Sequence, residues 1–295
     1  MPTAVAIPCA ALKLKKILVA TDFSEISGRA LDYAASFARR YDSHLELAHV
    51  IRTNATAQPV LPSSQEEDKK LLRSKIQKLA SYTSRGGVRV ATSLVEGPVG
   101  RSVHDLMLLH EIDMVAVGTH GKRSPEAGLL GSVAEEIFRE VPCPVLTIGP
   151  AVLRRPELEI RFRHILYATD FTPESAQAAP LALSLAEEYR ARLTLVHVVP
   201  EEMVSMPEIE RHAEYYCEEL RKLTSPEAQQ WCRPNFLTEY GSPGTVIIDF
   251  ARDNDVDLIV LGAKKGSVVA HRSFSGTAYN VVCNAECPVL TVRGR

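Results

Sequence analysis

The sequence predicts an α/β protein built from two tandem Rossmann-like domains, each an open parallel sheet of five strands, ordered 3-2-1-4-5 and flanked by helices. Three observations lead to this prediction. The chain repeats itself, because KILVATDFS at 16–24 returns as HILYATDFT at 164–172. Within each copy, short apolar runs rich in β-branched residues alternate with longer segments of helical period. Strands that alternate with helices are joined by right-handed crossovers, which makes the sheet parallel and places helices on both faces.

The repeat extends over nearly the whole chain. The offset of 148 residues also relates His49-Val50 to His197-Val198, and CPVLT at 143–147 returns with an offset of 144. A copy of about 140–150 residues has an ordinary domain size. Because Pro150, Arg154, Arg155 and Pro156 form a polar stretch, we place the linker near residue 155. The expected organisation is an N-terminal extension at 1–14, a first domain at 15–150 and a second domain at 156–295.

The expected elements follow from these patterns in chain order. In the first copy, apolar β-branched runs predict strands near 16–21, 44–50, 88–95, 113–118 and 143–148. Apolar residues at helical spacing predict helices between them, near 25–41, 65–84, 98–111 and 132–141. The second copy repeats the strands near 163–168, 192–198, 234–240, 257–262 and 287–292. In such a sheet, ligands bind outside the carboxyl ends of strands 1 and 4, where the strand order reverses.

Composition argues against several classes of protein. Hydrophobic residues make up 45% of the chain, charged residues 24%, and the net charge is -2, which is not the basic balance of a nucleic-acid-binding protein. No apolar stretch approaches the roughly 20 residues of a membrane helix, and the N-terminal apolar run precedes its basic residues, unlike a secretory signal. The six cysteines show no CxxC pair and no metal-ligand spacing. We therefore expect reduced thiols in a cytoplasmic protein, with no metal site and neither nucleic acid nor membrane as partner.

A glycine-rich loop follows the fourth expected strand of the first copy. Ser132 and Glu135 have the spacing of a capping box, which predicts that a helix begins where the loop ends. Glycines let backbone N–H groups approach an anion, and a helix N-terminus adds the positive end of its dipole. The glycines of this loop are Gly118, Gly121, Gly128 and Gly131. The loop also contains His120, Lys122 and Arg123, whose side chains are more typical of solvated groups than of obligatory ligands.

A second candidate feature is the aspartate that follows the first strand of each copy. Thr172 is followed by Pro173 and Glu174, a favourable N-cap series, so Thr172 and its counterpart Ser24 are expected to cap the helices. Asp22 and Asp170 then lie two residues outside those helices, where a carboxylate can accept a hydrogen bond from a ribose hydroxyl or an adenine amino group. A purely structural role for the carboxylate remains an alternative.

These motifs resemble those of the universal stress protein family. The resemblance rests on Gly118-x2-Gly121-x9-Gly131-Ser132, on ATDFS near the start and on PCPVLTI at the end, and it covers both copies. In the ATP-binding branch of that family, the glycine motif holds the phosphates and ribose, an Asp after strand 1 contacts the nucleoside, and a Val after strand 2 contacts the adenine. The resemblance therefore implies ATP, with or without Mg2+, as the ligand of Asp22, Val50, Val117, Gly118, Gly121, Gly131, Ser132 and Val133. It also implies an internal pseudo-dimer paired through the last strand of each copy, and it leaves a homodimer open.

The second copy departs from the glycine motif. Three residues instead of two separate Gly262 from Gly266, although nine still separate Gly266 from Gly276. One extra residue shifts every amide that follows it, so we expect the first copy to bind ATP and the second to bind it more weakly or not at all. The residues carried over to the second copy are Asp170, Val198, Gly262, Gly266, Gly276 and Thr277.

The function implied is a stress-response protein that binds adenine nucleotide as a switch or sensor, with at most slow ATP hydrolysis. The sequence contains neither a GxxxxGK[ST] P-loop nor a GxSxG elbow, and it names no general base. A nucleotide-independent scaffold is the alternative: the helical region at 200–233, with the lone Trp231, would offer a partner surface, or would simply cover the sheet. An ATP pyrophosphatase or nucleotidyl transferase ranks last, because ATDFSE stands where an SGGxDS-type phosphate loop belongs.

Overall fold

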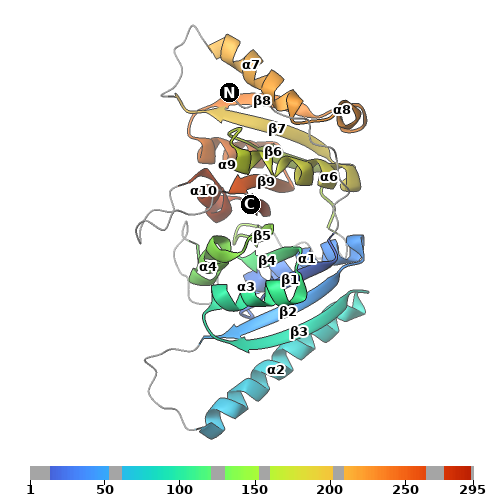
Figure 1. The fold of residues 1–295 in the computed structure, drawn as a ribbon, viewed down its shortest axis with the longest axis vertical. Coiled ribbons are helices and arrows are strands. Elements are labelled where there is room, and N and C mark those ends of the chain that lie inside the picture. Colours follow the sequence, from blue (N-terminus) through green and yellow to red (C-terminus); the bar gives the residue numbers. More distant parts are fainter. Residues whose placement is uncertain are drawn as a thin grey trace.

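A computed structural model describes residues 14–52, 62–120, 130–152, 160–201, 209–263 and 276–293. Strands alternate with helical segments, as predicted, with differences of a few residues at their ends (Figure 1). In the second copy, two helices follow each other between β6 and β7 and again between β7 and β8. The first copy comprises β1 (Lys16–Ala20), α1 (Glu25–Tyr41), β2 (His44–Ile51), α2 (Pro62–Arg85), β3 (Arg89–Glu96), α3 (Val99–His110), β4 (Met114–Gly118), α4 (Ser132–Glu140) and β5 (Val145–Ile148). The second comprises β6 (His164–Ala168), α5 (Pro173–Ala176), α6 (Ala179–Tyr189), β7 (Arg192–Val199), α7 (Ile209–Lys222), α8 (Pro226–Cys232), β8 (Asn235–Tyr240), α9 (Pro243–Asp253), β9 (Leu258–Ala263), α10 (Thr277–Asn284) and β10 (Val289–Arg293).

The strands form one continuous sheet in the order β3-β2-β1-β4-β5-β10-β9-β6-β7-β8. Each half has the predicted order 3-2-1-4-5, and the two halves join where β5 pairs antiparallel with β10. The Thr147 hydroxyl donates a hydrogen bond to the carbonyl of Val289 at 3.0 Å. The equivalent Thr291 hydroxyl donates to Val145 at 3.3 Å, so the contact is nearly symmetric. The internal pseudo-dimer implied by the resemblance is therefore present.

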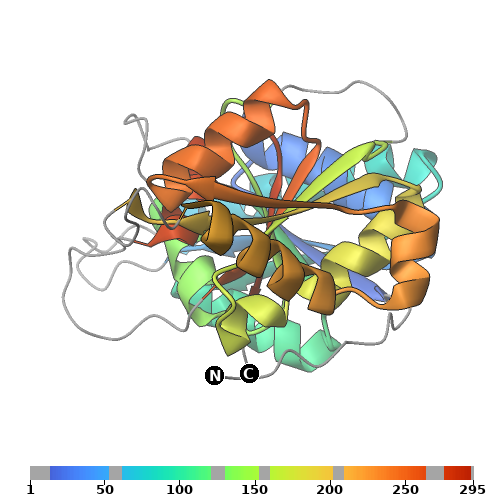
Figure 2. The same cartoon turned by 90° about the horizontal axis from the view of Figure 1, so that it is seen from above.

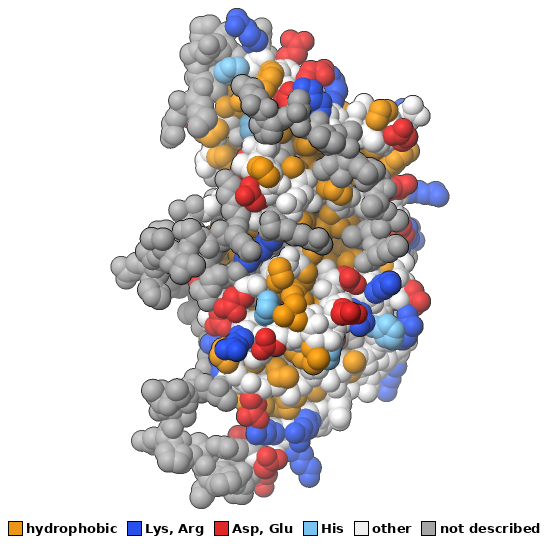
Figure 3. All heavy atoms as spheres, in the orientation of Figure 1, with side chains coloured by type: hydrophobic (Ala, Val, Ile, Leu, Met, Phe, Trp, Pro, Cys, Tyr) orange, Lys and Arg blue, Asp and Glu red, His pale blue; other side chains and the backbone are white. Residues whose placement is uncertain are grey.

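Helices cover both faces of the sheet (Figure 2). Buried side chains of α1, α2, α6, α7 and α8 belong to one hydrophobic cluster, and those of α3, α4, α9 and α10 belong to another. Both clusters run across the two halves, because each face of the ten-stranded sheet is continuous. None of the helices in the described ranges has the length and apolar character needed to span a bilayer. On the face seen in Figure 3, basic and acidic side chains are interspersed.

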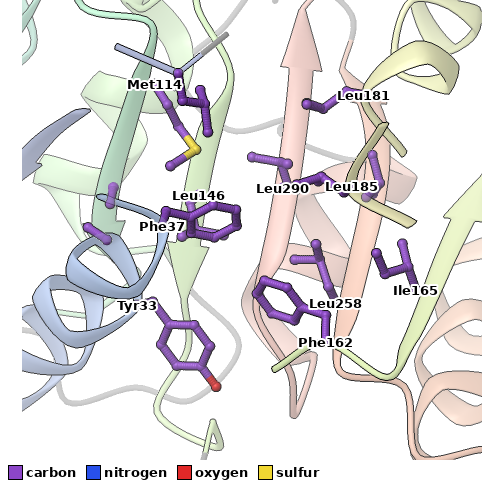
Figure 4. Packing of buried hydrophobic residues seen from close by; sticks show 14 of the residues in the cluster. Tyr33, Phe37, Met114, Leu146, Phe162, Ile165, Leu181, Leu185, Leu258 and Leu290 are labelled. Carbon is purple, nitrogen blue, oxygen red and sulfur yellow. The ribbon is translucent and has the colours of Figure 1, made fainter. Parts of the chain in front are cut away.

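An aromatic contact joins the two halves on the α1 face. Phe37 of α1 lies 5.5 Å from Phe162, which precedes β6, and Phe162 lies 4.9 Å from Tyr189 of α6, measured between ring centroids. Figure 4 shows Phe37 and Phe162 together with Leu146 of β5 and Leu290 of β10, which are paired in the sheet. Complete burial of each such side chain contributes about 1.5–3 kcal/mol to folding. The halves therefore share one core rather than packing as separate bodies.

Polar contacts tie α1 to the segment between the halves. Arg29 donates hydrogen bonds from Nη1 to the carbonyl oxygens of Pro150 at 3.0 Å and Val152 at 2.6 Å. The amide of Ile160 donates to the hydroxyl of Ser36 at 2.9 Å. Helix α1, whose N-terminus adjoins the first candidate loop, thus also contacts residues on both sides of the connection between the halves.

Two of the motif glycines are required by packing. A Cβ atom on Gly118, at the end of β4, would lie 2.8 Å from Cγ2 of Ile26 and 3.1 Å from the amide nitrogen of Ser27 in α1. A Cβ atom on Gly262, at the end of β9, would lie 2.2 Å from the Cα atom of Ser175 in α5. The missing side chain lets the first helix of each half pack closely against the end of its fourth strand, whatever the glycine does for a ligand.

We expect Gly262→Ala to lower the free energy of unfolding by about 3 kcal/mol or more, because overpacking against backbone cannot be relieved by a rotamer change. Gly118→Ala is expected to cost less, since the methyl group of Ile26 can move. Urea unfolding followed by circular dichroism measures both. Gly28→Ala in α1 is the control: its Cβ meets nothing within 4 Å, so it should be neutral or stabilising by up to about 1 kcal/mol. Equal stability of Gly262→Ala and wild type would contradict the packing argument.

Acid is expected to destabilise the second half through two buried histidines. Burial lowers the pKa of His164 and of His197 below the ordinary value of 6.5. Both rings are hydrogen-bonded: His164 contacts Thr194 Oγ1 at 2.9 Å and the carbonyl of Asn254 at 3.0 Å, and His197 contacts the carbonyl of Thr169 at 2.8 Å. As the pH falls, the unfolded chain therefore binds protons at a higher pH than the folded protein does. The free energy of unfolding that these histidines contribute above about pH 6.5 is lost as the pH falls below that value.

The expected result is a free energy of unfolding that declines between pH 7 and pH 5, by at most about 1.4 kcal/mol per pH unit for each histidine. Urea titrations across this range measure the slope. The double variant His164→Gln/His197→Gln should show a shallower slope than wild type. An identical slope in both proteins would show that other groups govern the acid response.

Candidate functional site

The turn after β1 is a compact motif that presents Asp22 at the carboxyl end of the sheet. Ser24 caps α1 as predicted, since its hydroxyl accepts a hydrogen bond from the amide of Ser27 at 3.1 Å. Asp22 nevertheless has a structural contact as well, because its Oδ1 atom accepts the amide of Ser24 at 2.9 Å. Phe23 adopts a left-handed backbone with φ of 59° and packs against His49 at 4.6 Å between ring centroids. A carboxylate has several acceptor sites, so holding the turn leaves Asp22 able to contact a ligand.

The same turn follows β6 in the second copy. Asp170 accepts the amide of Thr172 at 3.1 Å, and Thr172 caps α5 as predicted. Phe171 has φ of 58° and packs against His197 at 4.7 Å. The repeated ATDF-Ser/Thr sequence is therefore a repeated structural device, and the aspartate alone does not show which copy binds a ligand.

The histidines on β2 and β7 stabilise these turns. His49 donates from Nδ1 to the carbonyl of Thr21 at 2.6 Å, and His197 donates to Thr169 at 2.8 Å. Elsewhere, His110 on α3 contacts the buried carboxylate of Glu46. The described ranges contain no group of three His, Cys, Asp or Glu side chains that could hold a metal ion.

The two candidate loops of the first copy follow the carboxyl ends of two neighbouring strands. Strands β1 and β4 are parallel neighbours, with Ala20 opposite Val117. Asp22 follows β1 by two residues and Gly118 ends β4, where it contacts the first turn of α1. The expected juxtaposition at the point of strand reversal is present.

Helix α4, which follows the loop after β4, begins without a side-chain cap from its N-cap residue. Gly131 is the N-cap residue in an extended conformation, and its amide donates to the carbonyl of Thr119 at 2.7 Å. Ser132 is the first helical residue, so the predicted helix start is correct but the predicted capping box is wrong. The amide of Glu135 makes an ordinary helical bond to Gly131 at 2.9 Å. Within the described residues, no N-cap side chain therefore occupies the amides of the first turn, the groups of a helix that favour an anion.

The three candidate valines lie on one face of the sheet. Val117 is buried in the cluster on the α3 and α4 face, and Val50 and Val133 pack against that cluster while half-buried. The side chain of Val117, with 2% exposure, is part of the core, so only its backbone can contact a ligand. Gly121, Gly128, Lys122 and Arg123, and in the second copy Gly266, lie outside the described residues.

His120 is not a solvated side chain, contrary to the prediction from its polar loop. It is 7% exposed, and its Nδ1 atom contacts Thr119 Oγ1 at 2.9 Å. Its Nε2 atom is buried without a hydrogen-bond partner in the described part of the chain. Because a buried polar atom without a partner is costly, we expect a group beyond the described residues, a ligand or an ordered water among the candidates, to contact it. Nothing in the local sequence reveals that this loop histidine is buried.

Arg52 is a site residue that the sequence patterns did not single out. It directly follows β2, and its Nη2 atom donates to Ser132 Oγ at 2.9 Å. The same atom lies 3.6 Å from Oε1 of Glu136, whose other oxygen accepts the amide of Gly100 at 2.8 Å. The sequence offered one signal. Arg52 is a basic residue directly after strand 2, whereas the equivalent residue of the second copy, 148 residues later, is Pro200.

Comparison with known proteins decides the family. The model of the universal stress protein family matches residues 13–149 and again residues 161–293. The chain belongs to the universal stress protein family. A universal stress protein of Methanocaldococcus jannaschii is 28% identical over 149 residues, which is 49% of this chain and 85% of that protein. A Staphylococcus aureus (strain USA300) protein named for the same family is 30% identical over 153 residues, covering 50% of this chain and 89% of that protein.

Solved structures agree with the tandem arrangement of this universal stress protein. A crystal structure of a universal stress protein from Archaeoglobus fulgidus DSM 4304 superimposes with a TM-score of 0.70 at 18% identity, covering 96% of this chain and 99% of the other. A Pseudomonas aeruginosa PAO1 protein of unknown function has a TM-score of 0.64 at 19% identity, with coverage of 95% and 92%. These likenesses establish the fold of two joined universal stress protein domains.

The second domain presents a different surface around its own turn. Tyr216 of α7 lies 4.3 Å from His197 and 5.9 Å from Phe171, so an aromatic side chain covers the turn after β6. Gly276 is the N-cap of α10 and Thr277 its first residue, both exposed. Val198 is 7% exposed. Helix α7 thus covers the sheet, which is the simpler of the two interpretations of the segment at 200–233.

One contact crosses from the second domain to the glycine loop of the first. The amide of Leu130, next to Gly131, donates a hydrogen bond to the phenol oxygen of Tyr279 on α10 at 3.2 Å. Counted from the N-cap glycines, the residue equivalent to Tyr279 is Ala134 on α4, which has no polar side chain to reciprocate. At this pair of equivalent positions, the side-chain contact therefore runs from the second domain to the first.

We expect Tyr279→Phe to speed amide exchange at Leu130 about 5-fold in the full-length protein, because a typical hydrogen bond contributes about 1 kcal/mol. Hydrogen–deuterium exchange resolved to single residues measures this change, and thermal unfolding should be little altered. Tyr215→Phe on α7, with 47% exposure, is the control and should leave Leu130 unchanged. Unchanged exchange in Tyr279→Phe would show that this bond does not hold the loop.

Proposed function

We propose that this universal stress protein binds ATP in its first domain and acts as a nucleotide-dependent switch or sensor in the cytoplasm. The observation that supports the proposal best is the N-terminus of α4, which begins after the fourth strand without a side-chain cap. The buried Nε2 atom of His120, in the loop before this helix, has no hydrogen-bond partner within the described residues. A helix N-terminus favours anions through its free amides and dipole. We take 1–14 as an extension and 15–150 and 156–295 as the two domains.

In the proposed complex, the phosphates lie against the first turn of α4. The amides that follow Gly131, at Ser132 and Val133, would donate to phosphate oxygens. Asp22 would accept a hydrogen bond from the nucleoside, and Val50 would line the adenine. Where Mg2+ accompanies ATP, the phosphate oxygens would bind it. Gly118 contributes chiefly by letting α1 approach β4.

We further propose that the second domain binds ATP more weakly or not at all. Its α10 also begins without a side-chain cap, so the helix end alone does not separate the domains. The second domain differs in three other ways: its motif carries an inserted residue, Pro200 stands where the first has Arg52, and Tyr216 covers the turn after β6. Each difference removes a contact or shifts an amide in the second site.

We propose at most slow hydrolysis of the bound ATP. The sequence has no P-loop, and the groups at the crevice are hydrogen-bond donors and a turn-forming carboxylate. Such groups position phosphates without activating a water molecule. A switch that is read out by nucleotide occupancy needs no more than this.

The decisive test compares two matched variants. Ser132→Glu and Thr277→Glu each place a carboxylate at the first residue of an exposed helix start, where it interacts favourably with the helix dipole by about 0.3–1 kcal/mol. Folding should therefore survive both changes. We expect Ser132→Glu to weaken ATP binding at least 10-fold through repulsion of the phosphates, and Thr277→Glu to leave it within 2-fold of wild type. Isothermal titration of the full-length, nucleotide-free protein measures both.

Each alternative outcome has a distinct meaning. Weakening by Thr277→Glu alone would assign the site to the second domain. Tight ATP binding that neither variant affects would show that the phosphates do not lie against α4. If the wild-type protein binds no adenine nucleotide, the nucleotide-independent scaffold becomes the better account.

A further inference from the structure

Arg52 occupies an electrostatically unfavourable position. Its guanidinium lies beside Ser132, the first residue of α4, where the helix dipole presents its positive end. A cation is destabilised at a helix N-terminus, where anions are favoured. Glu136, one turn further along the helix, compensates with an oxygen 3.6 Å from Nη2. The Glu136 carboxylate therefore stabilises a cation at a position where the helix dipole alone disfavours one.

The carboxylate that holds Arg52 is itself fixed. Glu136 accepts the amide of Gly100 through Oε2 at 2.8 Å. A Cβ atom on Gly100 would lie 2.8 Å from the Cβ atom of Glu136, so the two helices approach closely at this point. The connection from α3 through Glu136 to Arg52 orients the guanidinium at the first turn of α4. This arrangement is typical of a positioned recognition group rather than a mobile surface cation.

The guanidinium retains the capacity to bind a ligand. The side chain of Arg52 is 43% exposed, and its contacts within the described residues both use Nη2. Arginine carries five N–H donors in a fork that matches phosphate oxygens. A second and independent sign of a missing partner is the buried Nε2 atom of His120, which has no hydrogen-bond partner among the described residues. His120 follows Thr119, whose carbonyl accepts the amide of Gly131, the N-cap of α4. Both residues point to an anion at this helix end.

We propose that Arg52 is the specificity-determining residue that makes the first domain select nucleotides by the charge of their phosphate chain. This inference rests on the proposed ATP site and adds to it. Binding of a phosphate would neutralise the guanidinium and satisfy its remaining donors. The benefit grows from adenosine, which has no phosphate, to AMP and to ATP. The second domain, with Pro200 at the equivalent position, lacks this selection.

The experiment measures the affinities of the full-length protein for ATP, AMP and adenosine by isothermal titration. Arg52→Gln removes the charge and keeps hydrogen-bonding capacity, whereas Arg52→Lys keeps the charge without the fork. We expect Arg52→Gln to weaken ATP binding about 10- to 100-fold, as for loss of hydrogen bonds to a charged group, and to change adenosine binding less than 2-fold. Arg52→Lys should show an intermediate loss. Arg101→Gln on α3, a surface cation with 80% exposure, is the control and should change neither affinity.

The outcomes separate this inference from the proposed function. An equal loss of ATP and adenosine binding in Arg52→Gln would mean that Arg52 only supports the local fold, which overturns the charge selection. Unchanged ATP binding would overturn it as well, and in both cases the nucleotide site itself would stand. A wild-type protein that binds adenosine as tightly as ATP would also refute it. Failure of the wild-type protein to bind any of the three ligands would remove the proposed function and this inference together.

Discussion

The antiparallel pairing of β5 with β10 is the contact on which the rest of the structure depends. Three residue pairs and two reciprocal threonine hydrogen bonds join the sheets, and each face then carries one continuous hydrophobic cluster. The same pairing brings α10 of the second domain beside the end of the first domain's glycine loop, where Tyr279 contacts Leu130. The strand pairing thus brings a side chain of one domain against the backbone of the other.

The two domains repeat the fold and differ in the groups at the carboxyl end of the sheet. Both have the Asp-containing turn, the close glycine at the end of the fourth strand and an uncapped helix after the loop. What distinguishes them is chemistry added to this framework: a cation beside α4 in one, and a covering tyrosine in the other. Duplication allows this difference, because the two copies can carry different side chains on the same framework.

Most of the fold was predictable from the sequence, because repeats, strand alternation and helix caps are local signals. Ser24 was recognised as a cap through its counterpart Thr172, whose following proline makes the helix start unambiguous. The capping box at Ser132 was wrong because Gly131 can itself take the extended conformation that precedes a helix. Arg52, Tyr279 and the burial of His120 were not predicted, since each depends on contacts between segments distant in sequence. Gly118 was assigned to ligand approach, whereas packing against α1 also requires it.

The junction strand also has an evolutionary consequence. Since β5 and β10 occupy equivalent places in the two copies, the edge that each offers is close to self-complementary. A single-domain ancestor with such an edge would have associated with a second identical molecule in the same geometry. Fusion of two copies into one polypeptide makes that association independent of protein concentration. It also frees the two partners to diverge, because a change in one no longer appears in both.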